Sequence, residues 1–505
     1  MRIKHDLVLW WIKRDFRLAD NEALSRAAAE SRQVLPVYVF EPGVWTGEDA
    51  SLLHFRAISK ALEGLRRQIQ TRGGELLILT GELPEAFHSL RRELPFEAVY
   101  SHEETGLAAT FRRDRQVRRE LRRAGIPFTE VPRNGVVRGL RDRDERIGIW
   151  YGRMRREPLP APRELQVHAH IRAFAAETAL LKEEQLPTAL TRRDRLPAAS
   201  LGGDDGRPVP QQRVDEEAAR ITLESFLGIR ARDYNAGISD MNRAPGSCSR
   251  ISVHLAWGTI SMRQVFQALE KRLADPALPS GFSRGLRSFR SRIFWHDHFV
   301  QRLEDEPEAE SQPLNRAFAA APFRDDSKLL RAWMEGMTGF PMVDASMRCL
   351  QSSGYLNFRM RAMLISAAVH MLHLPWQRIL YPMARGMADY VPGIHVSQTQ
   401  MQAGVVGINT IRIYSPQKQL RDHDPDCRFV KKWIPELRDV PAEAIRAAEI
   451  PETGSAKAYP APIVDYSSSV KHMRRELWGI KGSEFGREEA QRVLRRHGSR
   501  RRRGR

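Results

Sequence analysis

The first 150 residues alternate short apolar segments of strand length with longer amphipathic segments of helix length. The strand-like segments are residues 7–12, 34–40, 76–79, 98–100 and 128–131. The helix-like segments between them include residues 23–30, 52–70 and 108–123. This alternation predicts βαβ units, and hence a doubly wound α/β domain built on a mostly parallel sheet. No G-x-G-x-x-G motif follows any of the strands, so a dinucleotide site of the usual Rossmann type is not supported.

The chain changes character twice after residue 150. Residues 151–215 are rich in Pro, Arg and Ala, which predicts a long interdomain connection with a short helix near residues 168–182. Residues 216–485 show helical periodicity and few strand signals, so we expect an all-α second domain. Residues 486–505 carry a run of arginines, and we expect them to form a basic disordered tail.

The charge and cysteine content narrow the possible functions. The chain has 81 Lys and Arg against 62 Asp and Glu, a net charge of +19 that favours a polyanionic partner such as nucleic acid. Its three cysteines are too few and too widely spaced for a disulfide framework or a zinc site, so we expect a cytoplasmic protein without a metal. The longest apolar helix-like stretch, residues 363–374, falls short of the roughly 20 residues that a membrane span needs, so we expect no membrane partner.

Four blocks of sequence resemble the DNA photolyase and cryptochrome family. The first block is L-W-W-I-K-R-D-F-R-L-A-D-N at residues 9–21. The others, in chain order, are G-T-I-S at 258–261, T-G-F-P-M-V-D-A-S-M-R at 338–348, and R-I-Y-S-P at 412–416 followed by W-I-P-E-L at 433–437. The resemblance covers roughly residues 5–440. It implies an α/β antenna domain, a long linker and a helical domain that holds FAD.

The resemblance also implies a chemistry. In this family, reduced flavin excited by light passes an electron to a pyrimidine dimer flipped out of damaged DNA, the dimer splits, and the electron returns. We therefore expect a carbon–carbon lyase that repairs cyclobutane pyrimidine dimers. Two alternatives stay open, a cryptochrome-like blue-light photoreceptor and a photolyase for another lesion such as the 6-4 photoproduct. A second antenna chromophore is compatible with the family, but no motif in this sequence identifies it.

The resemblance assigns the FAD diphosphate to residues 247–252, where the family has G-T-S-x-L-S. Hydroxyl side chains and free N–H groups at a helix start suit phosphate oxygens. Cys248 replaces the threonine of the motif, whereas Ser249 and Ser252 keep their hydroxyls. Tyr234 matches a tyrosine that approaches the same phosphates. Without the family match, a serine cluster of this kind is more often a plain helix cap.

Arg361 and Asp389 match an ion pair that lies beside the flavin ring in the family. A guanidinium there stabilises the anionic reduced flavin, and its carboxylate partner avoids an unpaired buried charge. Without the family match, a structural salt bridge is the simpler interpretation. The same register places His395 opposite flavin N5, where a histidine, whose unperturbed pKa is about 6.5, could tune flavin protonation. A register shifted by two residues places Gly393 there instead.

The residues expected at DNA include both matches to the family and departures from it. Trp295 matches the tryptophan that stacks on the flipped dimer. Arg292 stands where cyclobutane photolyases have a glutamate, and Phe358 stands where they have an asparagine. The histidine pair typical of 6-4 photolyases is missing as well, so a cyclobutane dimer remains our first choice. The full set implied to contact DNA is Arg243, Arg292, Trp295, Gln301, Arg359 and Gln419.

The tryptophan chain that photoreduces flavin in most relatives looks broken. Trp376 matches its middle member, but the flavin-proximal position falls at Thr399 and the surface position near Phe323. A single tryptophan cannot form that hopping route. Other aromatic residues that could provide one are Tyr355, Tyr390 and Trp257.

Overall fold

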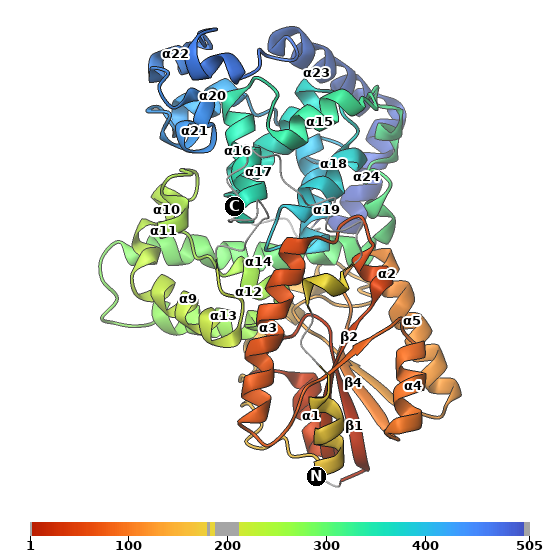
Figure 1. Cartoon of the computed structure of the whole chain (residues 1–505). Coiled ribbons are helices and arrows are strands. Elements are labelled where there is room, and N and C mark those ends of the chain that lie inside the picture. The colour runs from red at the N-terminus through yellow and green to blue at the C-terminus, as the bar shows by residue number, and fades with distance from the viewer. Residues whose placement is uncertain (1–2, 179–181, 187–211, 499–505) are drawn as a thin grey trace.

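The computed structural model describes residues 3–178, 182–186 and 212–498. Figure 1 shows an α/β domain, coloured red to orange, below a helical region coloured green to blue. Across the described ranges, no helix is both long enough and apolar enough to cross a membrane. This arrangement confirms the two-part fold class expected from the sequence.

All five predicted strands form and pair in one parallel sheet. They are β1 (His5–Ile12), β2 (Ser31–Phe40), β3 (Leu77–Thr80), β4 (Ala98–His102) and β5 (Phe128–Val131). The spatial order is β3-β2-β1-β4-β5, so the direction in which strands are added reverses beside β1. In open parallel sheets, such a reversal leaves a crevice at the carboxyl ends of the strands, and ligands bind there.

Helices cover both faces of the sheet. Alternate side chains of β1 point to opposite faces of the sheet. Val8 and Trp10 pack on one face, and Leu9 and Trp11 pack on the other. The first face packs on α1 (Glu22–Glu30) and α3 (Leu52–Gln70), and the second on α4 (Glu85–Glu93), α5 (Ala108–Arg123) and α7 (Ala169–Ala176). Burial of both faces explains why β1 is an unbroken apolar run in the sequence. Two further helices of this domain are α2 (Pro42–Trp45) and α6 (Glu145–Met154).

The predicted interdomain connection is described only in part. The short helix expected near residues 168–182 is α7. Residues 179–181 and 187–211 of that connection lie outside the described residues.

The helical region surrounds one long helix, α14 (Phe282–Asp305). Before it come α9 (Glu216–Gly228), α10 (Tyr234–Gly237), α11 (Ala244–Ser247), α12 (Ser252–Trp257) and α13 (Met262–Leu273). After it come α15 (Ser327–Glu335), α16 (Pro341–Ser353), α17 (Phe358–Ser366), α18 (Trp376–Arg385), α19 (Pro392–Ala403), α20 (Pro416–His423), α21 (Arg428–Trp433), α22 (Ala442–Ala447), α23 (Tyr466–Gly482) and α24 (Glu484–His497).

A close helix crossing fixes α19 against α14. A Cβ atom added at Gly393 on α19 would lie 2.7 Å from the Cα of Val300 on α14, so only glycine permits this approach. The crossing brings the start of α19 beside the C-terminal third of α14. The residues expected at the flavin and those expected at the lesion therefore share one region of the fold.

The basic tail expected to be disordered from residue 486 is helical as far as His497, so that expectation was wrong for this part. Val493 of α24 is fully buried in the helical core. Arg492 and His497 both pair with Glu306, at 3.1 and 2.8 Å. Apolar burial and these long-range ion pairs stabilise a segment whose composition alone resembles a solvated tail. Residues 499–505 lie outside the described residues.

The docking of α24 gives a stability prediction. We expect Val493→Ala to lower the free energy of unfolding by about 2 kcal/mol, because it removes two fully buried methyl groups. The neighbouring Leu494 is 54% exposed, so Leu494→Ala should change the free energy of unfolding by less than about 0.5 kcal/mol. Urea denaturation of the two variants measures both values. Equal effects would show that α24 does not dock as described.

Candidate functional site

An ion pair between Arg361 and Asp389 lies at the centre of the helical region. Asn357 caps α17 by accepting from the amide of Met360, which places Arg361 in the first turn of this helix. Nη2 donates to Oδ2 of Asp389 at 3.2 Å, and Nη1, which donates to Sδ of Met387, lies 2.9 Å from Oδ1. The guanidinium thus meets the carboxylate through one charge-assisted hydrogen bond and one close charge contact.

The pair keeps Asp389 ionised. Burial raises the pKa of its carboxyl group, but the Arg361 charge, together with hydrogen bonds from Arg361 and Ser252, outweighs burial and holds the pKa below its ordinary value. The side chains of Arg361 and Asp389 are only 18% and 11% exposed, so water screens their attraction weakly. The site therefore offers a fixed positive group and a fixed negative group to a ligand.

The segment expected at the FAD diphosphate forms one wall of the same region. Arg230 donates to the carbonyl oxygens of Cys248 and Ser249. Arg292 hydrogen-bonds the hydroxyl of the buried Tyr234, and burial raises the pKa of that hydroxyl well above its ordinary value. Burial and the neighbouring Arg250 together lower the pKa of Arg230, as expected where positive charges gather.

This donor set fits a diphosphate, because hydroxyls and guanidinium groups are the usual partners of phosphate oxygens. The cavity between Ser252, Arg250, Tyr355 and Asp389 measures about 10 Å³, close to the space of one water. The Arg250 guanidinium lies 3.5 Å above the Tyr355 ring, at the edge of this cavity.

His395 lies next to the ion pair. It is 5% exposed, and its Nε2 donates to the carbonyl oxygen of Leu380 at 2.6 Å. Burial lowers its pKa to about 4, and the Arg361 charge acts in the same direction, so the ring is neutral at neutral pH. Gly393, which the shifted register places at the flavin, packs instead against the backbone of α14. Of the two residues, only His395 presents a side chain beside Arg361 and Asp389.

Trp295 projects from α14 and is 41% exposed. Phe299 lies nearly parallel to it at 5.7 Å, and His298 meets its ring edge-on at 4.7 Å. These contacts orient the indole, and its exposed part is available for stacking. Arg243 and Phe358 are also exposed, and Arg359 is half-buried.

Two glutamines expected at DNA are buried in the fold. Gln301 accepts from the amide of Val137 at 2.7 Å and donates to its carbonyl at 2.9 Å, so its side chain anchors the loop after β5. Gln419 is 5% exposed on α20. In this structure neither side chain reaches the surface, so neither is available for a direct phosphate contact.

Of the three positions that match the family's tryptophan chain, only that of Trp376 holds a tryptophan. Trp376 is 1% exposed in the helical core, which Phe323 also contacts, and the buried Thr399 has no ring. Tyr390 and Trp257, far apart in sequence, lie on either side of His54, with ring centroids 5.4 and 5.6 Å from its ring. Sequence spacing carried no signal for this cluster, because His54 comes from the α/β domain.

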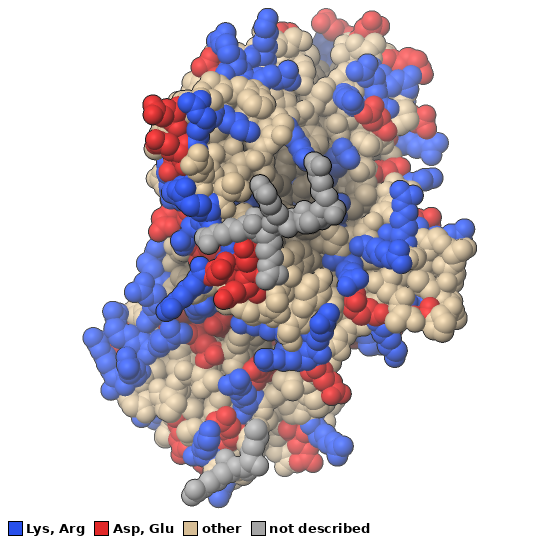
Figure 2. Space-filling view, turned by 180° about the vertical axis from the view of Figure 1, so that it is seen from behind, with Lys and Arg blue, Asp and Glu red and all other residues tan. Residues whose placement is uncertain are grey.

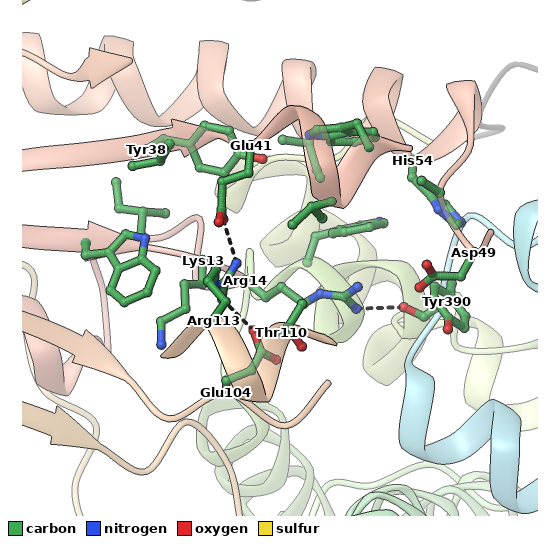
Figure 3. A pocket seen from close by; sticks show the side chains of 18 residues that line it. Lys13, Arg14, Tyr38, Glu41, Asp49, His54, Glu104, Thr110, Arg113 and Tyr390 are labelled. Carbon is green, nitrogen blue, oxygen red and sulfur yellow. Dashed lines mark hydrogen bonds and ion pairs between the residues drawn. The ribbon is translucent and has the colours of Figure 1, made fainter. Parts of the chain in front are cut away.

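A second cavity, of about 100 Å³, opens at the carboxyl ends of the strands, where the α/β domain meets the helical region (Figure 3). Lys13 and Arg14 follow β1, Glu41 follows β2 and Glu104 follows β4. This is the crevice that the strand order predicts. No phosphate-binding motif marks these strand ends, so the cavity has no signature in the amino-acid sequence.

Charged groups and aromatic rings line different parts of this cavity. Arg113 pairs with Glu41 at 2.7 Å and with Glu104 at 3.2 Å. Burial raises the pKa of Glu41 to about 7, against the opposing charge of Arg113. Further lining residues are Tyr38, Trp45, Trp257 and Tyr390. The cavity therefore suits a flat ligand that has an apolar ring and a few polar edges.

Comparisons with known proteins agree with this architecture. Residues 8–139 match the family model for DNA photolyase, and residues 289–479 match the model for the FAD binding domain of DNA photolyase. The helical region thus contains an FAD-binding domain of this type.

Individual relatives are similar over nearly the whole chain. A deoxyribodipyrimidine photo-lyase of Synechococcus is 26% identical over 92% of this chain and 95% of its own length. A cryptochrome DASH of Natronomonas pharaonis is 26% identical over 91% of this chain and 98% of its own length. The crystal structure of a photolyase from Sulfolobus tokodaii shares the fold, with a TM-score of 0.73, 23% identity, and coverage of 94% of this chain and 100% of that one. The resemblance drawn from the sequence is confirmed, and the chain belongs to the DNA photolyase and cryptochrome family.

Proposed function

We propose that the chain is a deoxyribodipyrimidine photo-lyase, which splits cyclobutane pyrimidine dimers in DNA by light-driven electron transfer. The observation that carries this proposal is the Arg361–Asp389 pair, formed within the part of the chain that matches the FAD binding domain of DNA photolyase. The photo-lyase of Synechococcus, similar along 92% of the chain, supports the same activity. We place the protein in the cytoplasm, in keeping with its three unpaired cysteines.

Bound FAD supplies the light-driven electron, and the protein supplies binding and orientation. Ser249, Ser252 and Arg230 would hold the diphosphate, with Cys248 contributing its backbone. Arg361 would face the flavin ring with a positive charge, and Asp389 would keep that charge from being buried alone. His395, neutral and fixed through Nε2, would present an uncharged polar ring beside this pair.

DNA binding would use the basic surface together with Trp295. Figure 2 shows Lys and Arg side chains spread over both domains on the face in view. Such charge binds the phosphate backbone with little sequence preference. The exposed ring of Trp295 would stack on the flipped lesion, and Arg292, Arg243 and Arg359 would line its approach. Arg292 replaces the acidic group of other photolyases, which makes this a variant way of holding the lesion.

Two alternatives have a specific observation in their favour. The buried Gln301 and Gln419 remove two polar DNA contacts, and Arg292 and Phe358 change two more. A photolyase for another lesion, such as the 6-4 photoproduct, would need a pocket changed in this way. A cryptochrome-like photoreceptor would not need the contacts at all, and a cryptochrome DASH is among the relatives.

We also propose that the 100 Å³ cavity at the strand ends holds a second chromophore. Its aromatic lining and its position against the FAD-binding domain suit a ring that passes absorbed light to the flavin. The Sulfolobus tokodaii photolyase is described as holding two FAD molecules, with a light-harvesting cofactor implied. A flavin-like ring is the ligand class that this comparison favours.

The proposed activity is tested directly with a synthetic oligonucleotide that carries one cyclobutane thymine dimer. Purified, chemically reduced protein is incubated with it in blue light and in darkness, and recovered thymine is measured. We expect recovery in light only. No recovery from protein with FAD bound and reduced would contradict the proposal, and the same assay with a 6-4 product would then separate another lesion from a photoreceptor.

The flavin site gives a second prediction. Arg361→Ala leaves the Asp389 carboxylate buried without its partner, so we expect FAD affinity to fall at least about tenfold. The control is Arg378→Ala, because Arg378 forms an exposed pair with Asp325 at 2.9 Å. The ratio of flavin absorbance to protein absorbance in the purified variants reports bound FAD. Full FAD retention in Arg361→Ala would exclude the ion pair from the flavin site.

The lesion site gives a third prediction. Trp295→Ala removes a stacking surface worth about 1–3 kcal/mol per base, so binding to dimer-containing DNA should weaken about tenfold and binding to undamaged DNA much less. Trp478→Ala is the matched control, because Trp478 on α23 is 46% exposed. Fluorescence anisotropy with both DNAs measures the difference. Equal losses on the two DNAs would contradict the assigned role of Trp295.

A further inference from the structure

The turn between α18 and α19, residues 386–391, carries Asp389 and is held by side chains from elsewhere in the fold. His54 Nε2 bonds the carbonyl oxygen of Met387 at 2.9 Å. Trp257 Nε1 donates to the carbonyl of Ala388 at 2.8 Å. Arg14 Nη1 donates to the carbonyl of Tyr390 at 3.1 Å, as the dashed line in Figure 3 shows.

These three donors come from three different elements. Arg14 follows β1 and His54 lies in α3, both in the α/β domain, whereas Trp257 ends α12. His54 and Trp257 are 3% and 2% exposed. Carbonyl groups buried in this way need partners, because an unmet buried polar group costs about 1–3 kcal/mol. The turn can therefore keep its conformation only while these donors stay in place.

The ring of Tyr390, next to Asp389, is packed by the same residues. His54 stacks on it at 5.4 Å with an interplanar angle of 9°. The Arg14 guanidinium lies 5.9 Å from the Tyr390 ring and 4.9 Å from the Trp257 ring. The Tyr390 hydroxyl bonds Asp49, a further residue of the α/β domain. Backbone and side-chain contacts thus restrain Met387 and Ala388 before Asp389 and Tyr390 after it.

We propose that Arg14, His54 and Trp257 are positioning residues for Asp389, acting through the backbone of residues 387–390. Their bonds set where the Asp389 carboxylate meets Arg361, so the α/β domain helps to orient the charged pair on which FAD depends. The inference rests on the proposed flavin site. A carboxylate shifted by about 1 Å would lose the hydrogen bond of 3.2 Å and the close charge contact of 2.9 Å, which makes the positioning measurable.

Trp257→Phe is the main test variant, because it keeps an aromatic ring and removes the donor to Ala388. The matched control is Trp333→Phe, since Trp333 is fully buried and its Nε1 donates to the carbonyl of Leu364 at 3.1 Å. Both variants lose one indole-to-carbonyl bond, so we expect similar drops in unfolding temperature. Only Trp257→Phe should raise the FAD dissociation constant, by about fivefold, as measured by flavin fluorescence with apo-protein.

A double-mutant cycle with Asp389→Asn separates positioning from general stabilisation. If Trp257 acts through the Asp389 carboxylate, the fivefold effect of Trp257→Phe should shrink to within about twofold in the Asp389→Asn background. Arg14→Met, which removes a donor from a half-buried side chain, is run as a second variant in case Trp257→Phe does not fold. Additive effects in the cycle, or equal FAD affinities for Trp257→Phe and Trp333→Phe, would overturn the proposal.

The readout is FAD binding without DNA or light. A wild-type protein that binds FAD and repairs no dimer would contradict the proposed repair activity and leave this test intact. A wild-type protein that fails to bind FAD would overturn both.

Discussion

The structure of the site depends on keeping Arg361 and Asp389 paired while both are mostly buried. Removing two such charges from water costs several kcal/mol per ion, and only good geometry and additional hydrogen bonds compensate for it. The cap from Asn357, the hydroxyl of Ser252 and the bonds to the turn around Asp389 all act on this geometry. The contact between the α/β domain and the helical region is thus part of the site as well as part of the fold.

The wall opposite this pair has a different electrostatic character. Arg230, Arg250 and Arg292 gather around Tyr234 and Cys248, and burial together with the charge of Arg250 lowers the pKa of Arg230. Such a concentration of guanidinium groups favours an anionic ligand. The same excess of positive charge continues over the surface, with a net charge of +19 for the whole chain. The FAD diphosphate and the proposed DNA partner are both anionic, so this excess of positive charge would favour binding of each.

The sequence predicted the parts of the fold that rest on local pattern. Residues of β1 are buried on both faces, so the strand was visible as an apolar run, and the helix periodicity was equally clear in α3 and α14. The α24 segment was misjudged, because its stability comes from contacts of Val493, Arg492 and His497 with distant residues. Charge composition near the chain end gave no sign of those contacts.

The sequence by itself determined the family, the two-part architecture and the pairing of Arg361 with Asp389, because ordered motifs and hydrophobic periodicity are properties of the linear chain. Only the tertiary structure decided that Gln301 and Gln419 are buried, that His395 rather than Gly393 lies beside the ion pair, and that Arg14, His54 and Trp257 converge on one turn. The physical reason is that burial and hydrogen-bond partners depend on which elements pack together. Elements separated by more than a hundred residues leave no mark of their contact in local sequence.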